Sequence, residues 1–182
     1  MTLIKEYHEI TLEEPTLDLV DKIAIERNLN LESLRTPHLL TKEMQRDFYK
    51  EVICNRSVNS RFYDIRILGD ESIGMGGFTP IQWENRCAEI SLILFKHSVG
   101  KGDGEKAMLR LLDDGFDRLN LNMIYGECYA CSKAIGFWRL MASKYHFYIT
   151  ELPYRKYFNG EYHSSLYFSI KKESWERLRG KR

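Results

Sequence analysis

The stretch that decides the fold reads Glu89-Ile-Ser-Leu-Ile-Leu-Phe-Lys-His-Ser-Val-Gly100-Lys-Gly-Asp-Gly-Glu-Lys-Ala-Met108. It begins with a nearly continuous apolar run from Ile90 to Phe95, which is typical of a strand covered on both faces. Three glycines follow at alternate positions, and from Met108 to Leu119 apolar residues recur at helical spacing. The stretch therefore predicts a strand, a glycine-rich turn and a helix.

The glycine-rich turn suits a pyrophosphate. Glycine lets the backbone come close to a ligand, and the first N–H groups of a helix lack intrahelical partners and favour anions. The turn is not the nucleotide loop that ends in Gly-Lys-Ser/Thr, because Glu105 and Lys106 follow Gly104. It is not the dinucleotide fingerprint either, because the third glycine is missing at the required spacing. An ordinary tight strand–helix connection is the alternative.

Composition indicates a single soluble domain over residues 1–182. The chain is 43% hydrophobic and 29% charged with a net charge of +1, so charge gives no case for a nucleic acid or an anionic membrane as partner. We find no export signal and no apolar run long enough to cross a bilayer, and we therefore expect a cytoplasmic protein. Cys128 and Cys131 form a C-x-x-C without a second ligand pair, which favours reduced thiols over a metal site or a redox pair.

The rest of the chain alternates strand and helix patterns. Strands are expected over 2–11, 62–68, 73–81, 122–130, 145–152 and 162–170, and helices over 15–28, 41–52, 131–142 and from 173. Asn159-Gly160 is a hairpin turn dipeptide. Gly74, Gly76 and Gly77 within one strand indicate a close approach by a ligand or by another segment. These patterns predict an α/β fold with a mixed sheet of about seven strands flanked by helices.

Three segments carry a family resemblance. Val99–Ala107 resembles the acetyl-CoA pyrophosphate loop of the GCN5-related N-acetyltransferases (GNAT), and Ser132–Trp138 looks like the second cofactor helix of that family. Arg155–His163 resembles the closing hairpin of the branch that acetylates ribosomal-protein N-termini and amino sugars. The resemblance implies a GNAT-type, mostly antiparallel sheet and acetyl-CoA as co-substrate.

The resemblance also implies a set of cofactor-binding positions. Backbone groups of the loop would anchor the pyrophosphate, with lysines available for phosphates, and the main chain of the core strand would pair with pantetheine. Cys131 stands where the family commonly has asparagine, and Trp138 stands where relatives often have tyrosine. The full expected set is Leu92, Ile93, Leu94, Val99, Gly100, Lys101, Gly102, Asp103, Gly104, Cys131 and Trp138, with Lys106 as a further phosphate contact.

Catalytic groups are less clearly marked. Glu89, at the start of the core strand, is the expected general base, with a surface carboxylate as the alternative. Glu127, on the next strand, is a weaker candidate. Because the indole of Trp138 cannot serve as an acid at neutral pH, Tyr129 is the expected proton donor to the leaving thiolate.

The segment 26–49 resembles the acceptor side of amino-sugar acetyltransferases from the pseudaminic-acid pathway. It implies that Arg27, Arg35 and His38 bind the acceptor, with surface charges as the alternative. We therefore expect acetyl transfer, without metal, to the primary amine of a small molecule such as a nucleotide-linked amino sugar, by direct attack in a ternary complex. The alternatives are a ribosomal-type protein N-terminal acetyltransferase and a non-catalytic CoA-binding module; the sequence leaves a homodimer open.

Overall fold

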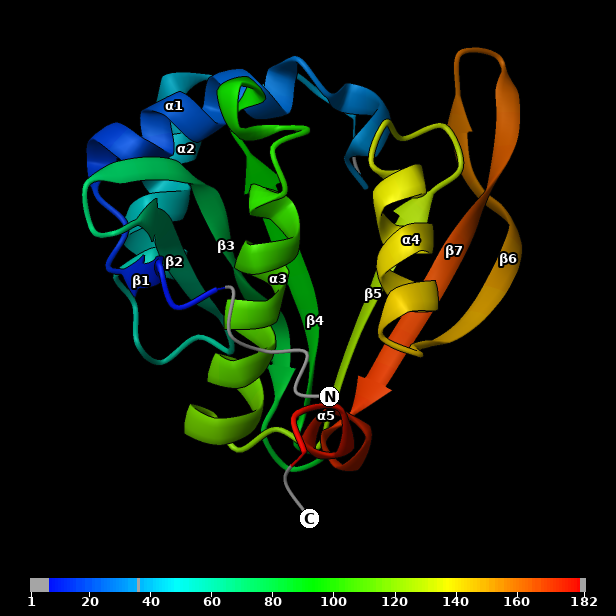
Figure 1. Cartoon of the computed structure of the whole chain (residues 1–182). Coiled ribbons are helices and arrows are strands. Elements are labelled where there is room, and N and C mark those ends of the chain that lie inside the picture. The colour runs from blue at the N-terminus through cyan, green and yellow to red at the C-terminus, as the bar shows by residue number, and fades with distance from the viewer. Residues whose placement is uncertain (1–6, 36, 181–182) are drawn as a thin grey trace.

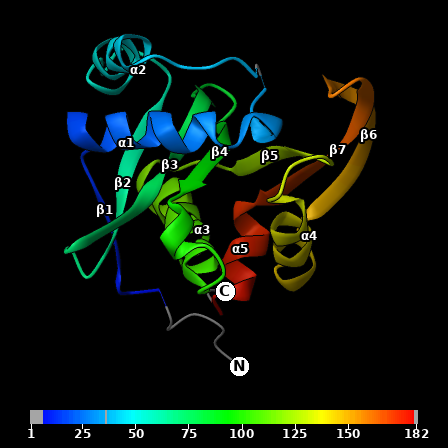
Figure 2. The same cartoon turned by 90° about the horizontal axis from the view of Figure 1, so that it is seen from above.

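The computed structural model describes residues 7–35 and 37–180. A seven-stranded sheet forms the middle layer, with α1 and α2 on one face and α3, α4 and α5 on the other (Figures 1 and 2). The strands are β1 (Ile10–Glu13), β2 (Arg61–Ile67), β3 (Glu71–Gln82), β4 (Cys87–Leu94), β5 (Met123–Tyr129), β6 (Tyr148–Phe158) and β7 (Glu161–Lys171). The helices are α1 (Leu17–Asn28), α2 (Lys42–Phe48), α3 (Asp103–Asp113), α4 (Ile135–Lys144) and α5 (Lys172–Leu178).

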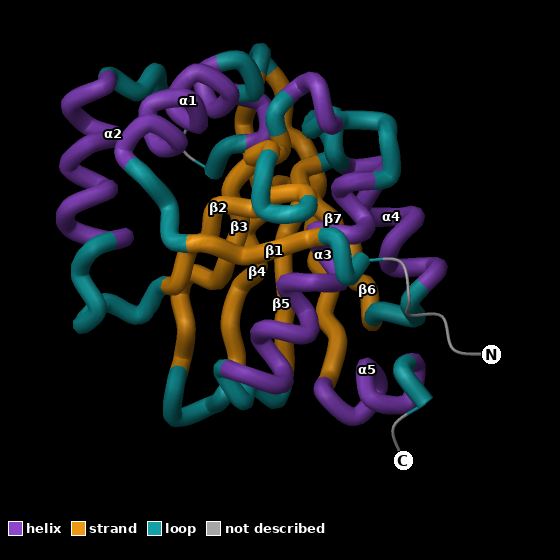
Figure 3. Tube along the Cα trace, turned by 60° about the vertical axis from the view of Figure 1, so that its left-hand side comes forward, coloured by secondary structure: helices purple, strands orange, loops and turns teal. Residues whose placement is uncertain are grey.

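The strand order is β1-β2-β3-β4-β5-β7-β6, and within the described part of the chain only the β4–β5 pair is parallel. The other neighbouring pairs are antiparallel, which confirms the mixed, mostly antiparallel sheet expected from the sequence. Figure 3 shows the strands as one continuous layer between the helices. The single parallel pair among these strands lies at the middle of the sheet and involves the first residues of β4, whereas the glycine-rich stretch follows the other end of β4.

Local capping explains where the first two helices begin. Thr16 Oγ1 accepts a hydrogen bond from the Leu19 N–H, and Thr41 Oγ1 accepts one from the Met44 N–H, each at 3.2 Å. After α2 the chain continues through one π-helical stretch, Tyr49–Ile53. The predicted helix over 41–52 therefore matches α2 together with this extension.

Three predicted elements have boundaries that differ from the structure. The strand expected over 145–152 covers Tyr148–Phe158. The helix expected from residue 131 begins at Ile135, because Ser132 Oγ accepts the Ala134 N–H at 3.1 Å and closes a turn first. The first strand was expected over 2–11 but covers Ile10–Glu13, and residues 2–6 of that range lie outside the described residues. The register of the β6–β7 hairpin follows the expected turn at Asn159-Gly160.

The glycines of β3 are needed for close contact with neighbouring backbone. A Cβ on Gly74 would collide with the carbonyl of Ile93 on β4, and one on Gly77 would collide with the carbonyl of Arg61 on β2. The close approach indicated by the sequence is therefore made by other strands of the sheet at these two glycines.

The two faces of the sheet have separate apolar clusters. On the α3–α5 face a large core includes Ile90, Met108 and Ile124, while on the α1 face Ile23 packs with Met75 and Phe95. Because side chains alternate along a strand, Glu89, Ser91 and Ile93 of β4 face α1. Within the described residues, none of the helices has the length and apolarity that a membrane crossing requires.

Candidate functional site

The two parallel strands at the centre of the sheet pair only at their beginnings. Their register ends at Glu89 and Tyr125, and Figure 1 shows β4 and β5 diverging beyond this point. We call the region between Ile90–Leu94 and Gly126–Tyr129 the β4–β5 opening. Strand edges that lose their partner present free N–H and C=O groups, so the opening can accept an extended ligand as an additional strand.

The backbone of β4 is oriented for such pairing at alternate residues. The Phe95 N–H donates to the Ile73 carbonyl of β3 at 2.9 Å. Since backbone groups of a strand alternate between its two edges, Leu92 and Leu94 direct theirs into the opening. Ile93, by contrast, directs its backbone groups towards β3.

The glycine-rich loop lies at the wide end of the opening. Gly100 and Gly102 have φ values of 83° and 89°, a conformation that favours glycine. From Gly100 to Gly104, none of the backbone N–H groups donates a hydrogen bond to another described residue. Consecutive free N–H groups at a helix N-terminus form an anion-binding site, and this arrangement fits a pyrophosphate.

Apolar side chains line the loop on the side of α4. A Cβ added to Gly104 would lie 3.2 Å from Leu94 Cδ1 and 3.3 Å from Phe137 Cε2, so the absence of a side chain keeps space between β4 and α4. Lys101 is exposed beside the loop. Lys106 forms an ion pair with Glu9, so the expectation that its ammonium is held ready for a phosphate is not supported.

At the narrow end of the opening, Glu89 forms an ion pair with a residue from a distant loop. Arg35 Nη2 donates to Glu89 Oε1 at 2.6 Å, and Arg35 also interacts with Tyr129. The Glu89 side chain is 17% exposed. Burial raises the pKa of Glu89, and the Arg35 guanidinium opposes that shift. The structure therefore brings together both expected catalytic residues and one expected acceptor residue.

A second carboxylate–arginine pair lies beside the first. Arg155 Nε donates to Glu127 Oε1 at 2.8 Å, and Ser165 Oγ donates to the same oxygen at 2.6 Å. The hydrogen bond from Arg155 lowers the pKa of Glu127, so this carboxylate is a poorer base than Glu89. Neither Arg155 nor Ser165 was singled out from sequence, because their partner lies 28 and 38 residues away.

Arg27 lies on the same side of the sheet as Glu89. It follows Ile23 at helical spacing on the buried face of α1, and Leu31, one turn further on, is held by Lys156 of β6. Arg27 therefore lies on the α1 face of the sheet, between Ile23, which packs with Met75 and Phe95, and Leu31. Among the described residues, its Nε is buried without a hydrogen-bond partner, and burial lowers its pKa. His38 is exposed, and no described contact brings it to this group.

The two residues that depart from the family pattern, Cys131 and Trp138, both contact other residues of the protein. Trp138 is 8% exposed, and its ring stacks on Phe168 at a centroid distance of 4.3 Å. The indole is therefore part of the core. Cys131 Sγ lies 3.5 Å from the Glu32 carbonyl, in the segment that follows α1.

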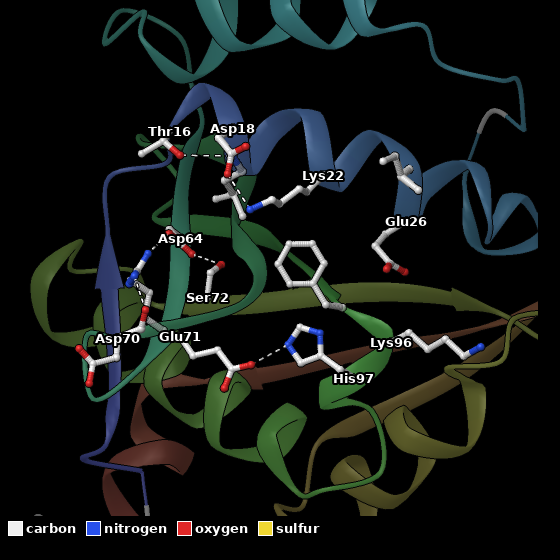
Figure 4. Close-up of a pocket in the computed structure, with 14 residues that line it drawn as sticks. Thr16, Asp18, Lys22, Glu26, Asp64, Asp70, Glu71, Ser72, Lys96 and His97 are labelled. Atoms are coloured by element: carbon white, nitrogen blue, oxygen red, sulfur yellow. Dashed lines mark hydrogen bonds and ion pairs between the residues drawn. The ribbon is translucent and has the colours of Figure 1, made fainter.

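A separate concavity of about 1070 Å³ lies on the other side of β4, between α1 and the β2–β3 turn (Figure 4). Its charged side chains are largely paired within the protein. Lys22 contacts Asp18 at 2.6 Å, and His97 contacts Glu71 at 3.2 Å. Glu89, Arg35 and Tyr129 are not among the residues that line this concavity. We therefore assign the candidate active site to the β4–β5 opening.

Comparisons with known proteins agree with this geometry. A family model described as an acetyltransferase (GNAT) domain matches residues 9–134. An uncharacterized N-acetyltransferase, p20 of Bacillus licheniformis, is 47% identical over 55 residues, which span 30% of this chain and 31% of that protein. The match thus covers about a third of this relative's length.

Solved structures with the same fold include bacterial polyamine acetyltransferases. Spermidine N-acetyltransferase from Vibrio cholerae in complex with CoA and spermine has a TM-score of 0.79 at 20% identity, covering 92% of this chain and 98% of that one. A dodecameric structure of the Vibrio cholerae enzyme has a TM-score of 0.78 at 19% identity, covering 96% and 99%. These likenesses confirm the expected fold. Because the family model matches residues 9–134 of the 182, the chain belongs to the GNAT acetyltransferase family, and acetyl-CoA is the co-substrate consistent with that membership.

Proposed function

We propose that this protein transfers an acetyl group from acetyl-CoA to the primary amine of a small molecule, by direct attack in a ternary complex. One observation carries the proposal: the β4–β5 opening joins a loop of unpaired N–H groups at one end to Glu89 at the other. Pyrophosphate at the loop and pantetheine along Leu92 and Leu94 would place the thioester towards Glu89.

In this reaction the amine nitrogen attacks the thioester carbonyl, a C–N bond forms and the C–S bond breaks. The amine loses a proton, and the CoA thiolate leaves with its electron pair. Glu89 is our proposed general base, because burial raises its pKa towards the range in which a carboxylate accepts a proton effectively. Tyr129, which interacts with Arg35 beside Glu89, is our proposed proton donor to the thiolate. Burial raises the pKa of the Cys128 thiol, which disfavours an acyl-cysteine intermediate there.

The charge pattern favours an acceptor that also carries an anionic group. Glu89 and Glu127 are each matched by an arginine, whereas Arg27 is substantially buried without a carboxylate partner among the described residues. An isolated buried cation is costly, and a phosphate or carboxylate on the acceptor would offset that cost. A nucleotide-linked amino sugar, the acceptor expected from the sequence, has this chemistry.

A polyamine is the second candidate. It is favoured by the two carboxylates at the opening and by the acceptor named for the solved Vibrio cholerae structures. None of the relatives reported above is named for an amino sugar or a ribosomal protein. A polycation would meet Arg27, Arg35 and Arg155 on the same side, which favours the anionic acceptor.

Turnover assays test these alternatives. Release of free CoA thiol is measured with acetyl-CoA and a panel of a nucleotide-linked amino sugar, spermidine and an alanine-terminated peptide. The proposal predicts turnover of the amino sugar, and Arg27→Met is expected to raise its KM without raising the KM of a neutral amine. If spermidine were the only amine acetylated, the proposed amino-sugar acceptor would be wrong and a polyamine would take its place. Absence of turnover with CoA binding intact would indicate a non-catalytic module.

We also propose self-association. β6 is an edge strand of the sheet and exposes Tyr148 and Ile149, which a second copy would cover. Light scattering measures the mass in solution, and a monomer at all concentrations would contradict this proposal.

A further inference from the structure

Lys156 of β6 is a buried lysine, 5% exposed. Its ammonium donates hydrogen bonds to three backbone carbonyls of one short segment: Leu31 at 3.1 Å, Glu32 at 2.7 Å, and Leu34. An ammonium has three N–H donors, so the charge is fully engaged by this segment. The chain positions that meet here are more than 120 residues apart.

Aromatic rings complete the surroundings of the Lys156 ammonium. The ring centroids of Tyr129 and Phe158 lie 4.8 Å and 5.2 Å from Nζ, within the range of cation–π attraction. Burial lowers the pKa of Lys156. Three carbonyls and two rings together compensate part of that desolvation.

Residues in the turn before α4 hold the same segment more weakly. Ser33 Oγ and Ser132 Oγ lie 2.7 Å apart, and Lys133 Nζ lies 3.4 Å from Glu32 Oε1 with its own side chain 76% exposed. Exposed ion pairs contribute little. Lys156 is therefore the main connection between the segment 31–34 and the sheet.

The segment 31–34 leads directly to Arg35. The Arg35 side chain is 62% exposed, yet its guanidinium reaches Glu89 at 2.6 Å. An exposed side chain of this length has many rotamers, so its pairing with Glu89 depends on where the preceding backbone is held. This backbone is held by Lys156.

We propose that Lys156 is a positioning residue: it fixes the segment 31–34 on the sheet, so that Arg35 pairs with Glu89 beside the acceptor. The inference rests on the proposed function for its kinetic consequence but not for its structural one. Both consequences can be measured separately.

The structural test is hydrogen–deuterium exchange in the full chain. The Ser33 and Leu34 amides donate to Asn30 and Leu31 carbonyls within the segment, and Lys156→Met keeps an unbranched side chain but removes the ammonium. We expect faster exchange at these two amides in Lys156→Met. Should that variant not fold, Lys156→Gln carries the same comparison.

Lys144→Met is the matched control. Like Lys156, Lys144 has a bonded ammonium beside an aromatic ring: it pairs with Glu105 of α3 and lies over the ring of Tyr145. It has no hydrogen bond or ion pair to the segment 31–34 among the described residues. We expect exchange at Ser33 and Leu34 to be unchanged in this control. Unchanged exchange in Lys156→Met would overturn the inference.

The kinetic test separates positioning from general stability. In Lys156→Met we expect the KM of the amine to rise about tenfold, the value of one lost charge-assisted hydrogen bond, while the KM of acetyl-CoA stays unchanged. The lower limb of the pH–rate profile should move to higher pH, because Glu89 loses the guanidinium that opposes the rise in its pKa. Lys156→Arg should restore part of both effects.

A double variant tests whether Lys156 acts through Arg35. If it does, adding Lys156→Met to Arg35→Gln should lower kcat/KM no further than Arg35→Gln alone. Fully additive losses would overturn the inference. Faster exchange in Lys156→Met, in a chain that acetylates no amine, would instead overturn the proposed function and leave the role of Lys156 in fixing the segment established.

Discussion

Gly102→Ala tests the assignment of the glycine-rich loop at the level of a single Cβ. Gly102 precedes α3 with a φ of 89°, and an added Cβ would meet no atom within 4 Å. The expected effect is therefore backbone strain without a clash. A non-glycine residue in this left-handed conformation costs about 1–2 kcal/mol.

This strain should appear in ligand binding. Because the N–H groups from Gly100 to Gly104 donate no hydrogen bonds to described residues, an alanine at position 102 can relax the free loop, and the strain returns when the loop closes on an anion. A cost of about 1–2 kcal/mol corresponds to a rise of about 5–30-fold in the Kd of acetyl-CoA.

Gly160→Ala is the matched control. Gly160 has the same φ of 89° and equally open surroundings, but it lies in the β6–β7 hairpin. Calorimetric titration of acetyl-CoA into both variants and into the unmodified protein gives the Kd values, and urea unfolding gives their stabilities. We expect weaker binding only in Gly102→Ala. An unchanged Kd in Gly102→Ala, or an equal rise in both variants, would refute the loop assignment.

Three further predictions concern the charged groups. Arg35→Gln should move the lower limb of the pH–rate profile to higher pH, because it removes the guanidinium that opposes the raised pKa of Glu89. Glu89→Gln should flatten that limb. If the limb is unchanged in both variants, Glu89 is not the general base. Asp113 accepts hydrogen bonds from Tyr7, Trp175 and Arg179, so Asp113→Asn should lower the free energy of unfolding by about 2 kcal/mol, measured with urea, while the Kd of acetyl-CoA is retained. A hydrogen bond from Arg155 lowers the pKa of Glu127. The stability that this bond contributes is therefore present above the ordinary glutamate pKa of 4.5 and is lost as the pH falls through the lowered pKa. Glu127→Gln should thus lose less stability than the unmodified protein between about pH 5 and pH 3, and an equal fall in the Tm of both proteins over that range would contradict this.

The sequence was sufficient for features that depend on neighbouring residues. The apolar run and the alternate glycines predicted the β4–loop–α3 unit, Thr41 predicted the start of α2, and Asn159-Gly160 predicted the hairpin. In each case the residues that predict the element lie within that element or directly beside it. Hydrophobic periodicity and turn-forming residues are therefore enough to predict it.

The site depended on contacts between distant segments. Glu89 and Arg35 were each expected from sequence, but their pairing across 54 residues was not. Lys156 gave no signal, because its partners are backbone carbonyls, which every residue type provides. The late start of α4 depends on one side-chain hydrogen bond from the Ala134 N–H to Ser132, and propensity alone does not show such a bond.

The most direct test of the account is an NMR titration of the isotopically labelled protein with acetyl-CoA, following backbone amides. We expect the largest shifts at Gly100, Gly102, Gly104, Leu92 and Leu94, because these N–H groups lie in the loop or point into the β4–β5 opening. Shifts confined to the residues of the concavity beneath α1, or no shifts at saturating acetyl-CoA, would contradict the central claim that this opening holds the co-substrate.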